Sequence, residues 1–148
     1  MGLEESQGRV KIFIRNLQKK IPVYPAGIKK SIFKALVNEG VKKGEITVSF
    51  VNDKQIARLN SKYLKISSPT DVLSFNLALG LTKPDAILAD IIVSAETAMR
   101  NSKIYKTTPS YELNLYSVHG LLHILGYDDH SRMKRITMRK KESSYVNP

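Results

Sequence analysis

One stretch, from position 108 to position 126, restricts the possible folds more than any other part of the chain. Thr108 and Pro109 form a typical helix start, as N-cap and first helical residue, and Gly126 is typical of the position just past a helix end. The apolar residues between them fall on more than one side of the predicted helix: Leu113, Tyr116, Val118, Leu121, Leu122 and Leu125. A helix that is apolar on several sides must be covered from several directions. We therefore expect a central, buried helix enclosed by the rest of the fold.

The other segments alternate between strand-like and helix-like patterns. Short apolar or alternating runs predict strands near 10–15, 46–51, 72–75 and 87–93. Apolar residues at helical spacing predict helices from Pro25 to a stop at Gly40, after Asp53 as an N-cap, over 95–103 and over 132–143. We find no internal repeat and no linker. The pattern therefore predicts one α+β domain over residues 9–148, preceded by a flexible N-terminus at 1–8.

The chain carries far more cations than anions. Its 148 residues include 24 Lys and Arg against 13 Asp and Glu, a formal net charge of +11 at neutral pH. This excess fits either a Lys-rich, highly soluble surface or a polyanionic partner, most often nucleic acid. Cysteine is absent, which excludes disulfides and thiolate metal ligands and allows a cytoplasmic location. No apolar run approaches the ~20 residues of a membrane span, so we expect no membrane partner.

All three histidines of the chain lie between positions 119 and 130. His119 and His123 are four residues apart on the predicted helix, which places both rings on one face with Cβ atoms ~6 Å apart. A turn at Gly126 allows His130 to fold back as a third ligand. Three protein ligands leave one position open for water, as in catalytic rather than structural zinc sites. We therefore predict one zinc ion per chain at His119, His123 and His130; the alternative is three unrelated histidines, two in the core and one in a loop.

The segment from His119 to Asp128 closely resembles the H-G-x-L-H-L-x-G-Y-D-H signature of the YbeY family. Members of that family are bacterial metal-dependent endoribonucleases and rRNA maturation factors. Residues 59–75 resemble the family's L-N-x-x-Y … P-T-D-V-L-S-F pattern, and residues 89–94 resemble its G-D-I-x-I-S strand. The resemblance implies an α+β fold in which the metal-binding helix packs on a small mixed sheet. It also implies a zinc-like ion, RNA as the substrate, and roles in 3′ processing of small-subunit rRNA and in ribosome quality control.

The chain departs from the family pattern at the third metal ligand. The family's third His usually follows Tyr-Asp directly, whereas here Tyr127 is followed by Asp128, Asp129 and then His130. Asp129 therefore occupies the family register and is an alternative third ligand. We favour His130, because imidazole suits zinc well and a loop can absorb one extra residue.

A second departure concerns the predicted catalytic residues. The family commonly has an Arg, considered important for ribonuclease activity, directly after the Tyr that matches Tyr63; here Leu64 and then Lys65 follow. Lys65 can supply charge to a phosphate, but it lacks the guanidinium fork. We assign Lys65 as a candidate catalytic residue. Asp71 and Asp128 are two further candidates, because they can orient the ligand imidazoles or act on the attacking water. A turn or cap role is the alternative for Asp71.

Basic residues crowd the segment that follows the histidines. Those expected to hold RNA phosphates are Arg132, Lys134, Arg135 and Arg139. A solvated helix face is the alternative interpretation of such a run.

The family resemblance implies a single-strand-specific, metal-dependent endoribonuclease that acts on rRNA of the small ribosomal subunit, with ribosomal proteins or assembly GTPases as further partners. The sequence leaves open whether water or the neighbouring 2′-hydroxyl attacks the phosphate. One alternative function is a non-enzymatic, rRNA-binding assembly factor with a structural metal. A weaker alternative is a peptidase, but the general-base Glu of the H-E-x-x-H motif is replaced here by Gly120.

Overall fold

The computed structural model describes residues 10–64, 71–77 and 85–146. The strands are β1 (Val10–Asn16), β2 (Lys43–Val51), β3 (Val72–Asn76) and β4 (Ala86–Ser94), and the helices are α2 (Pro25–Asn38), α3 (Asp53–Leu64), α4 (Ala95–Tyr105), α5 (Pro109–Ile124) and α6 (Arg132–Tyr145). Every predicted strand and helix is present. The N-terminus expected to be flexible at 1–8 and the predicted catalytic Lys65 lie outside the described residues. Within the described residues, no helix combines the length and the apolar composition needed to cross a membrane.

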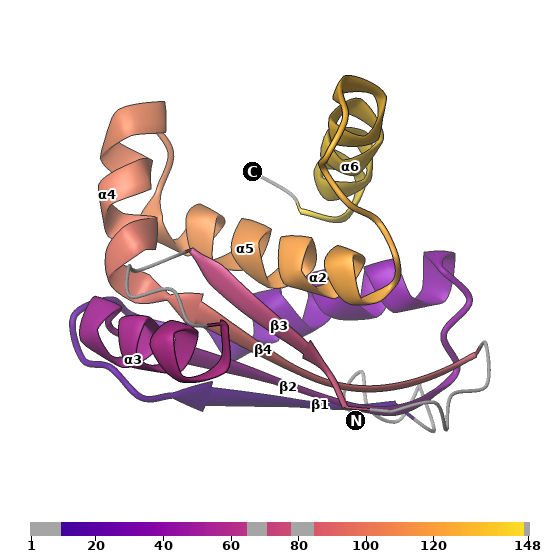
Figure 1. The fold of residues 1–148 in the computed structure, drawn as a ribbon, viewed down its shortest axis with the longest axis horizontal. Helices are drawn as coiled ribbons and strands as arrows, with labels where there is room; N and C mark the ends of the chain where they lie inside the picture. Colours follow the sequence, from indigo (N-terminus) through magenta and orange to yellow (C-terminus); the bar gives the residue numbers. More distant parts are fainter. Residues whose placement is uncertain (1–9, 65–70, 78–84, 147–148) are drawn as a thin grey trace.

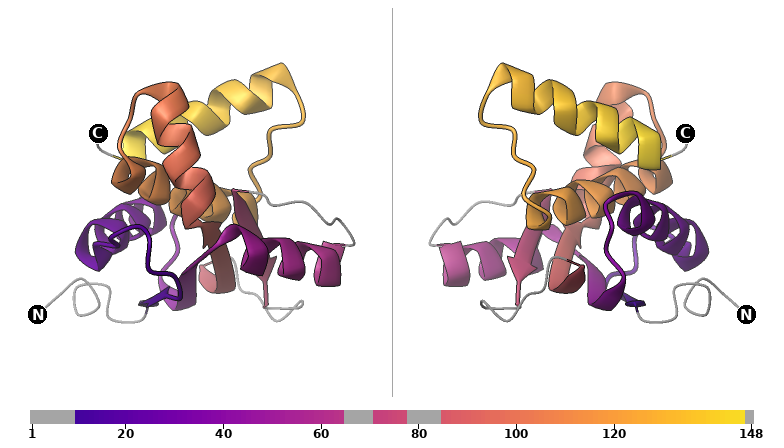
Figure 2. Two further views of the ribbon diagram at one scale, coloured as in Figure 1. Left: turned by 90° about the vertical axis from the view of Figure 1, so that its left-hand side faces the viewer. Right: turned by 90° about the vertical axis from the view of Figure 1, so that its right-hand side faces the viewer.

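The strands form a mixed sheet in the order β1-β2-β4-β3. β1, β2 and β4 run parallel, and β3 pairs antiparallel with β4 at one edge. Figures 1 and 2 show α2 and α5 along one face of this sheet, with α6 beyond them on the side away from the strands. On the opposite face, Ile56 of α3 packs with Leu73 of β3. The mixed sheet and the helix laid across it confirm the expected α+β fold.

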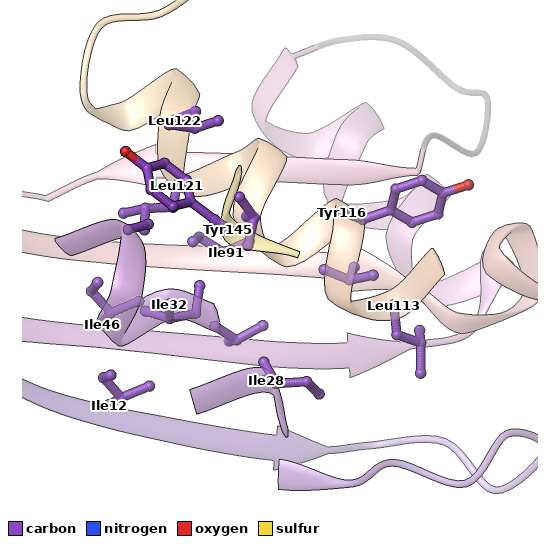
Figure 3. Close-up of a cluster of buried hydrophobic side chains, with 14 of the residues drawn as sticks. Ile12, Ile28, Ile32, Ile46, Ile91, Leu113, Tyr116, Leu121, Leu122 and Tyr145 are labelled. Carbon is purple, nitrogen blue, oxygen red and sulfur yellow. The ribbon is translucent and has the colours of Figure 1, made fainter. Parts of the chain in front are cut away.

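The main core lies between the sheet and the helices α2 and α5 (Figure 3). Because side chains alternate along a strand, one face of the sheet collects the apolar residues, among them Ile12, Ile46 and Ile91. Ile32 of α2 and Leu121 of α5 belong to the same buried cluster. α5 is enclosed by the sheet, α2, α4 and α6, so the prediction of a central helix is confirmed.

A close contact at Gly120 sets how deeply α5 lies on the sheet. A Cβ at this position would come within 2.8 Å of Ile91 Cγ2, 2.8 Å of Ser74 Oγ and 2.9 Å of Val72 Cγ2. The Ser74 hydroxyl donates a hydrogen bond of 3.0 Å to the Gly120 carbonyl. Position 120 therefore faces β3 and β4, and a glutamate there would point into the sheet rather than toward the histidines. This geometry adds to the argument against a peptidase.

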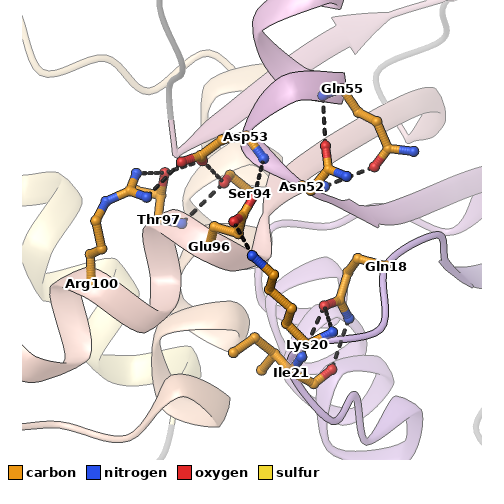
Figure 4. Close-up of polar contacts among 10 residues, drawn as sticks. All are labelled: Gln18, Lys20, Ile21, Asn52, Asp53, Gln55, Ser94, Glu96, Thr97 and Arg100. Carbon is orange, nitrogen blue, oxygen red and sulfur yellow. Dashed lines mark hydrogen bonds and ion pairs between the residues drawn. The ribbon is translucent and has the colours of Figure 1, made fainter.

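A polar network joins the ends of β2 and β4 to the helices that follow them (Figure 4). We expected Asp53 to cap α3, but Asn52 does so: Asn52 Oδ1 accepts the N–H of Gln55, and Gln55 Oε1 accepts the N–H of Asn52, both at 2.8 Å. The Asp53 carboxylate instead accepts hydrogen bonds from Ser94 (2.7 Å) and Arg100 (2.5 Å). The expectation for Asp53 was wrong because partners distant in the sequence engage it, which leaves its neighbour to cap the helix.

α6 is attached to the rest of the molecule by few apolar contacts and one polar cluster. Met138 and Tyr145 are its buried residues. Glu39, at the end of α2, accepts hydrogen bonds from the hydroxyls of Tyr127 and Tyr145, each at 2.6 Å, and from Lys141 Nζ at 2.9 Å. We call this cluster the Glu39 latch. Burial opposes the charged carboxylate, but the three donors outweigh burial and hold the pKa of Glu39 below its ordinary value.

The contact at Gly120 predicts that replacing glycine by alanine changes the free energy of unfolding in opposite directions in α5 and α2. Gly120→Ala should lower the free energy of unfolding by about 1–3 kcal/mol, because the added methyl group meets atoms that cannot move freely. Gly27→Ala in α2 is the matched control, since its Cβ would meet nothing within 4 Å. That control should raise the free energy of unfolding by about 0.4–1 kcal/mol. Urea denaturation measures both changes, and effects of the same sign would contradict the packing described for α5.

The Glu39 latch predicts a stability effect that depends on pH. Glu39→Gln should lower the free energy of unfolding at pH 7 by about 1–3 kcal/mol, because a charged acceptor is lost. Since the folded protein lowers the pKa of Glu39, the charged carboxylate stabilises the fold above the unfolded-state pKa, and this contribution disappears as the pH falls through the folded-state pKa. Urea denaturation of the two proteins should therefore give different free energies of unfolding at pH 7, and this difference should shrink as the pH falls below about 4.

Glu45→Gln, at an exposed position of β2, is the matched control for Glu39→Gln. It should change the free energy of unfolding by no more than about 0.5 kcal/mol. If Glu39→Gln loses as much stability below about pH 4 as at pH 7, the shape of the Glu39 side chain rather than its charge explains the stabilisation by the Glu39 latch.

Candidate metal centre

The two helical histidines lie one turn apart on the face of α5 that is turned toward α6. The Nε2 atoms of His119 and His123 are 2.9 Å apart, and the ring planes cross at 85°. Two nitrogens bound to one tetrahedral zinc ion, each at about 2.0–2.1 Å, lie about 3.3 Å apart. The helix alone therefore brings the two nitrogens close to the separation that a shared ion requires.

The end of α5 turns the chain back toward this pair. The N–H of Gly126 bonds to the carbonyl of His123 at 3.1 Å, and the N–H of Tyr127 bonds to the carbonyl of Leu122 at 3.0 Å. These two bonds define a Schellman motif, whose residue after the C-cap adopts a left-handed conformation. Gly126 has φ +102°, where a side chain would be strained. The Tyr127 hydroxyl then enters the Glu39 latch, which fixes the start of the following loop.

Asp129, rather than His130, joins the histidine pair. One carboxylate oxygen of Asp129 and one ring nitrogen from each of His119 and His123 lie within 4.8 Å of one another. His130 is not in this group; its side chain is exposed and its backbone N–H bonds to Asp128 Oδ1 at 3.0 Å. In the structure, Asp129 rather than the preferred His130 lies where a third ligand is needed. The hydrogen bond between Asp128 and His130 closes a tight turn in this loop. The turn places Asp129 on the side that faces the histidines of α5.

The donor set of this group fits a divalent metal ion. Two imidazoles and one carboxylate are a known ligand set of catalytic zinc sites, which keep a further position for water or substrate. All three side chains are partly buried, so an ion held there is shielded but reachable. His119, His123 and Asp129 thus form a candidate metal site whose position and donor types follow from the fold.

Glu142 is a member of the site that the sequence analysis missed. Its carboxylate contacts Nδ1 of His119, the ring nitrogen that faces away from His123. Metal-binding histidines commonly donate their second N–H to such a carboxylate, which fixes the orientation of the ring. One signal in the sequence pointed to this residue, because Glu142 is the only acidic residue in the otherwise basic α6.

The acidic surroundings of His119 raise its pKa. Burial works to lower the pKa of His119, whereas its hydrogen bond to Glu142 and the negative charges of Glu142, Asp71 and Asp129 raise it, and the net effect is a pKa above the ordinary value. Nδ1 of His119 lies within hydrogen-bonding distance of the Glu142 carboxylate, and Nε2 of His119 lies 2.9 Å from Nε2 of His123. To hold a metal ion between the two histidines, His119 would have to present Nε2 without a proton.

The two acidic residues predicted to assist catalysis lie in different surroundings. The carboxylate of Asp128 accepts the N–H of His130 and lies 3.2 Å from Lys134 Nζ, so it is engaged within its own loop. Asp71, immediately before β3, lines the same cavity as His119. Asp71 rather than Asp128 is therefore the one placed where it can act on a group near the metal site.

The four basic residues predicted to bind RNA are all exposed on α6: Arg132, Lys134, Arg135 and Arg139. Arg135 donates a hydrogen bond of 3.3 Å to the carbonyl of Asp129. Arg139 lines the cavity that also contains His119 and Glu142. The basic face of α6 therefore lies beside the candidate metal site.

The chain is similar to known proteins over most of its length. The family model described as Endoribonuclease YbeY matches residues 13–148. A protein named Endoribonuclease YbeY from Syntrophus aciditrophicus is 38% identical over 136 residues, covering 88% of this chain and 84% of that protein. Another of that name, from Carboxydothermus hydrogenoformans, is 34% identical over 136 residues, covering 90% and 94%. The solution structure of TM1509 from Thermotoga maritima has a TM-score of 0.63 and 25% identity, covering 90% of this chain and 87% of that chain. By these matches, the chain belongs to the Endoribonuclease YbeY family.

Proposed function

We propose that residues 9–148 form a single domain that acts as a zinc-dependent endoribonuclease on single-stranded RNA. Its substrate is the 3′ region of small-subunit rRNA in the cytoplasm, where it contributes to rRNA maturation and ribosome quality control. Ribosomal proteins or assembly GTPases are its further partners. The group of His119, His123 and Asp129 carries the proposal, together with the names of the relatives.

The three ligand residues would hold one zinc ion. When bound, the ion supplies Lewis-acid chemistry, which polarises a phosphoryl oxygen and makes water more acidic. Glu142 contacts Nδ1 of His119 and would keep Nε2 directed toward His123, where the ion would be held. Asp71 lies in the adjoining cavity and is the candidate to accept a proton from the attacking hydroxyl or water.

The basic face of α6 would bind the RNA backbone. Arg139 reaches the cavity beside His119, where a phosphate next to the metal would need a counter-charge. Arg132, Lys134 and Arg135 extend this positive surface along the helix and beside the loop that carries Asp129. The arrangement supports phosphate neutralisation by residues of α6 even without the arginine that the family has at the position of Leu64.

Replacement of His123 tests the proposed activity. With end-labelled small-subunit rRNA and added zinc, the wild-type protein should cleave the RNA. The cleavage rate of His123→Ala should be at least about 100-fold lower, because one of three metal ligands is gone. His130→Ala is the matched control, since its side chain is exposed and lies outside the ligand group. That control should cleave like the wild type, and a chelator should stop both.

Other outcomes of this assay discriminate among the alternatives. Equal cleavage by all three proteins would identify a contaminating nuclease. If none of them cleaves while zinc and RNA still bind, the non-enzymatic assembly factor becomes the better account. Loss of activity in His130→Ala but not in Asp129→Ala would restore His130 as the third ligand.

Replacement of Glu142 tests the role of the carboxylate behind His119. Glu142→Gln keeps the size of the side chain but removes its charge, and should weaken zinc binding about 10–100-fold. Competition against a fluorescent chelator measures this affinity without reference to cleavage. Lys140→Gln, at an exposed position of the same helix, is the control and should bind zinc like the wild type. Unchanged zinc affinity in Glu142→Gln would remove Glu142 from the site.

A further inference from the structure

A cavity of about 500 Å³ adjoins the metal centre. It extends along α5 from Tyr111 to His119, which spans about 12 Å of helix. α4 contributes Asn101 and Tyr105 to its lining, and α6 contributes Arg139. Cavities that hold small organic ligands have volumes of about 300–1,000 Å³, so this space is large enough for a nucleobase.

The charge of the lining identifies which part of an RNA strand fits. The lining carries the carboxylates of Asp71, Glu112 and Glu142, and its basic groups are the guanidinium of Arg139 and the imidazole of His119, which Glu142 contacts. Phosphate would be repelled by such a surface except beside Arg139. A neutral ring with hydrogen-bond donors on its edge is the complementary occupant.

The polar part of the lining is held in place before any ligand binds. Glu112 is 3% exposed and accepts hydrogen bonds from the hydroxyls of Thr107 (2.6 Å) and Tyr116 (3.0 Å). Asn101 Nδ2 donates to the hydroxyl of Tyr116. Groups fixed in this way lose little further freedom when a ligand docks against them.

An exposed aromatic ring lies at the same cavity. Tyr105, the last residue of α4, is 66% exposed, although burial of its ring would be favourable. Tyr111 lies on the lining nearby at the start of α5. Aromatic rings of this kind form stacking surfaces for bases of single-stranded nucleic acids.

We infer that this cavity is a subsite for one unpaired nucleobase adjacent to the phosphate at the metal centre. The inference rests on the proposed nuclease function. The base stacks on Tyr105, and its edge donates to the acidic lining. An exocyclic amino group offers two N–H donors against the single N3–H of uracil, so bases that carry an amino group bind better than uracil. A base inside a duplex cannot enter the cavity without unpairing, which gives a physical reason for selecting single strands.

The test compares two short single-stranded RNA probes, oligo(C) and oligo(U). Cytosine presents an amino group and an acceptor nitrogen where uracil presents a carbonyl and one N–H. Binding is followed by fluorescence anisotropy in a chelator, so that cleavage does not interfere. The wild type should bind oligo(C) several-fold more tightly. Tyr105→Ala should weaken oligo(C) binding about tenfold. Tyr24→Ala is the matched control, because Tyr24 is 62% exposed and lies outside the cavity lining.

An abasic scan sharpens the test. Removal of the base at one position of oligo(C) should weaken binding by the wild type as much as Tyr105→Ala weakens binding of intact oligo(C). Tyr105→Ala should lose no further affinity with the probe that lacks this base. The subsite is overturned if Tyr105→Ala binds like Tyr24→Ala, or if oligo(U) binds as tightly as oligo(C). In either case, zinc-dependent cleavage by the wild type would leave the nuclease proposal standing. A wild type that neither binds nor cleaves RNA would overturn both.

Discussion

The contact between Gly120 and the strands β3 and β4 determines the geometry of the proposed site. The absence of a side chain lets α5 lie close to the sheet, with the Ser74 hydroxyl bonded to the helix backbone at 3.0 Å. The histidines one residue before and three residues after Gly120 then project toward α6. A larger residue would lift the helix and move both rings together. Because the loop bearing Asp129 is held separately by the Glu39 latch, such a movement would change the distances among the three ligand residues.

α6 connects the candidate metal centre to the surface that would bind RNA. Two adjacent residues of this helix attach it at different points: Lys141 bonds to Glu39, and Glu142 contacts His119. The exposed face of the same helix carries the basic residues. A displacement of α6 by a bound RNA backbone would therefore move the Glu142 carboxylate, which contacts the ring of His119. This connection offers a physical route by which substrate binding and metal binding would influence each other.

The helices and strands could be predicted from the sequence because the residues that start and end them act locally. Thr108 accepts the N–H of Tyr111 as an N-cap, and Gly126 ends α5 with a left-handed turn, as their sequence positions predicted. The prediction was wrong where the role of a residue depends on partners that are distant in the sequence. Asp53 lost its expected capping role to Asn52 because Ser94 and Arg100 engage its carboxylate.

The histidine pair of the site also followed from the sequence, because a spacing of four residues on one helix fixes their separation. The third ligand did not, because the choice between Asp129 and His130 depends on the course of one loop rather than on donor chemistry. Glu142 was missed because its partner lies 23 positions away and on another helix. Helix spacing carries no information about such a contact.

The most direct measurement of the central claim is a crystal structure of the zinc-loaded protein with diffraction recorded on both sides of the zinc absorption edge. We expect one strong anomalous peak per chain, bound by Nε2 of His119, Nε2 of His123 and a carboxylate oxygen of Asp129. A peak bound by His130 in place of Asp129 would contradict the assignment of the third ligand. A peak elsewhere, with none between the two histidines, would contradict the metal centre itself.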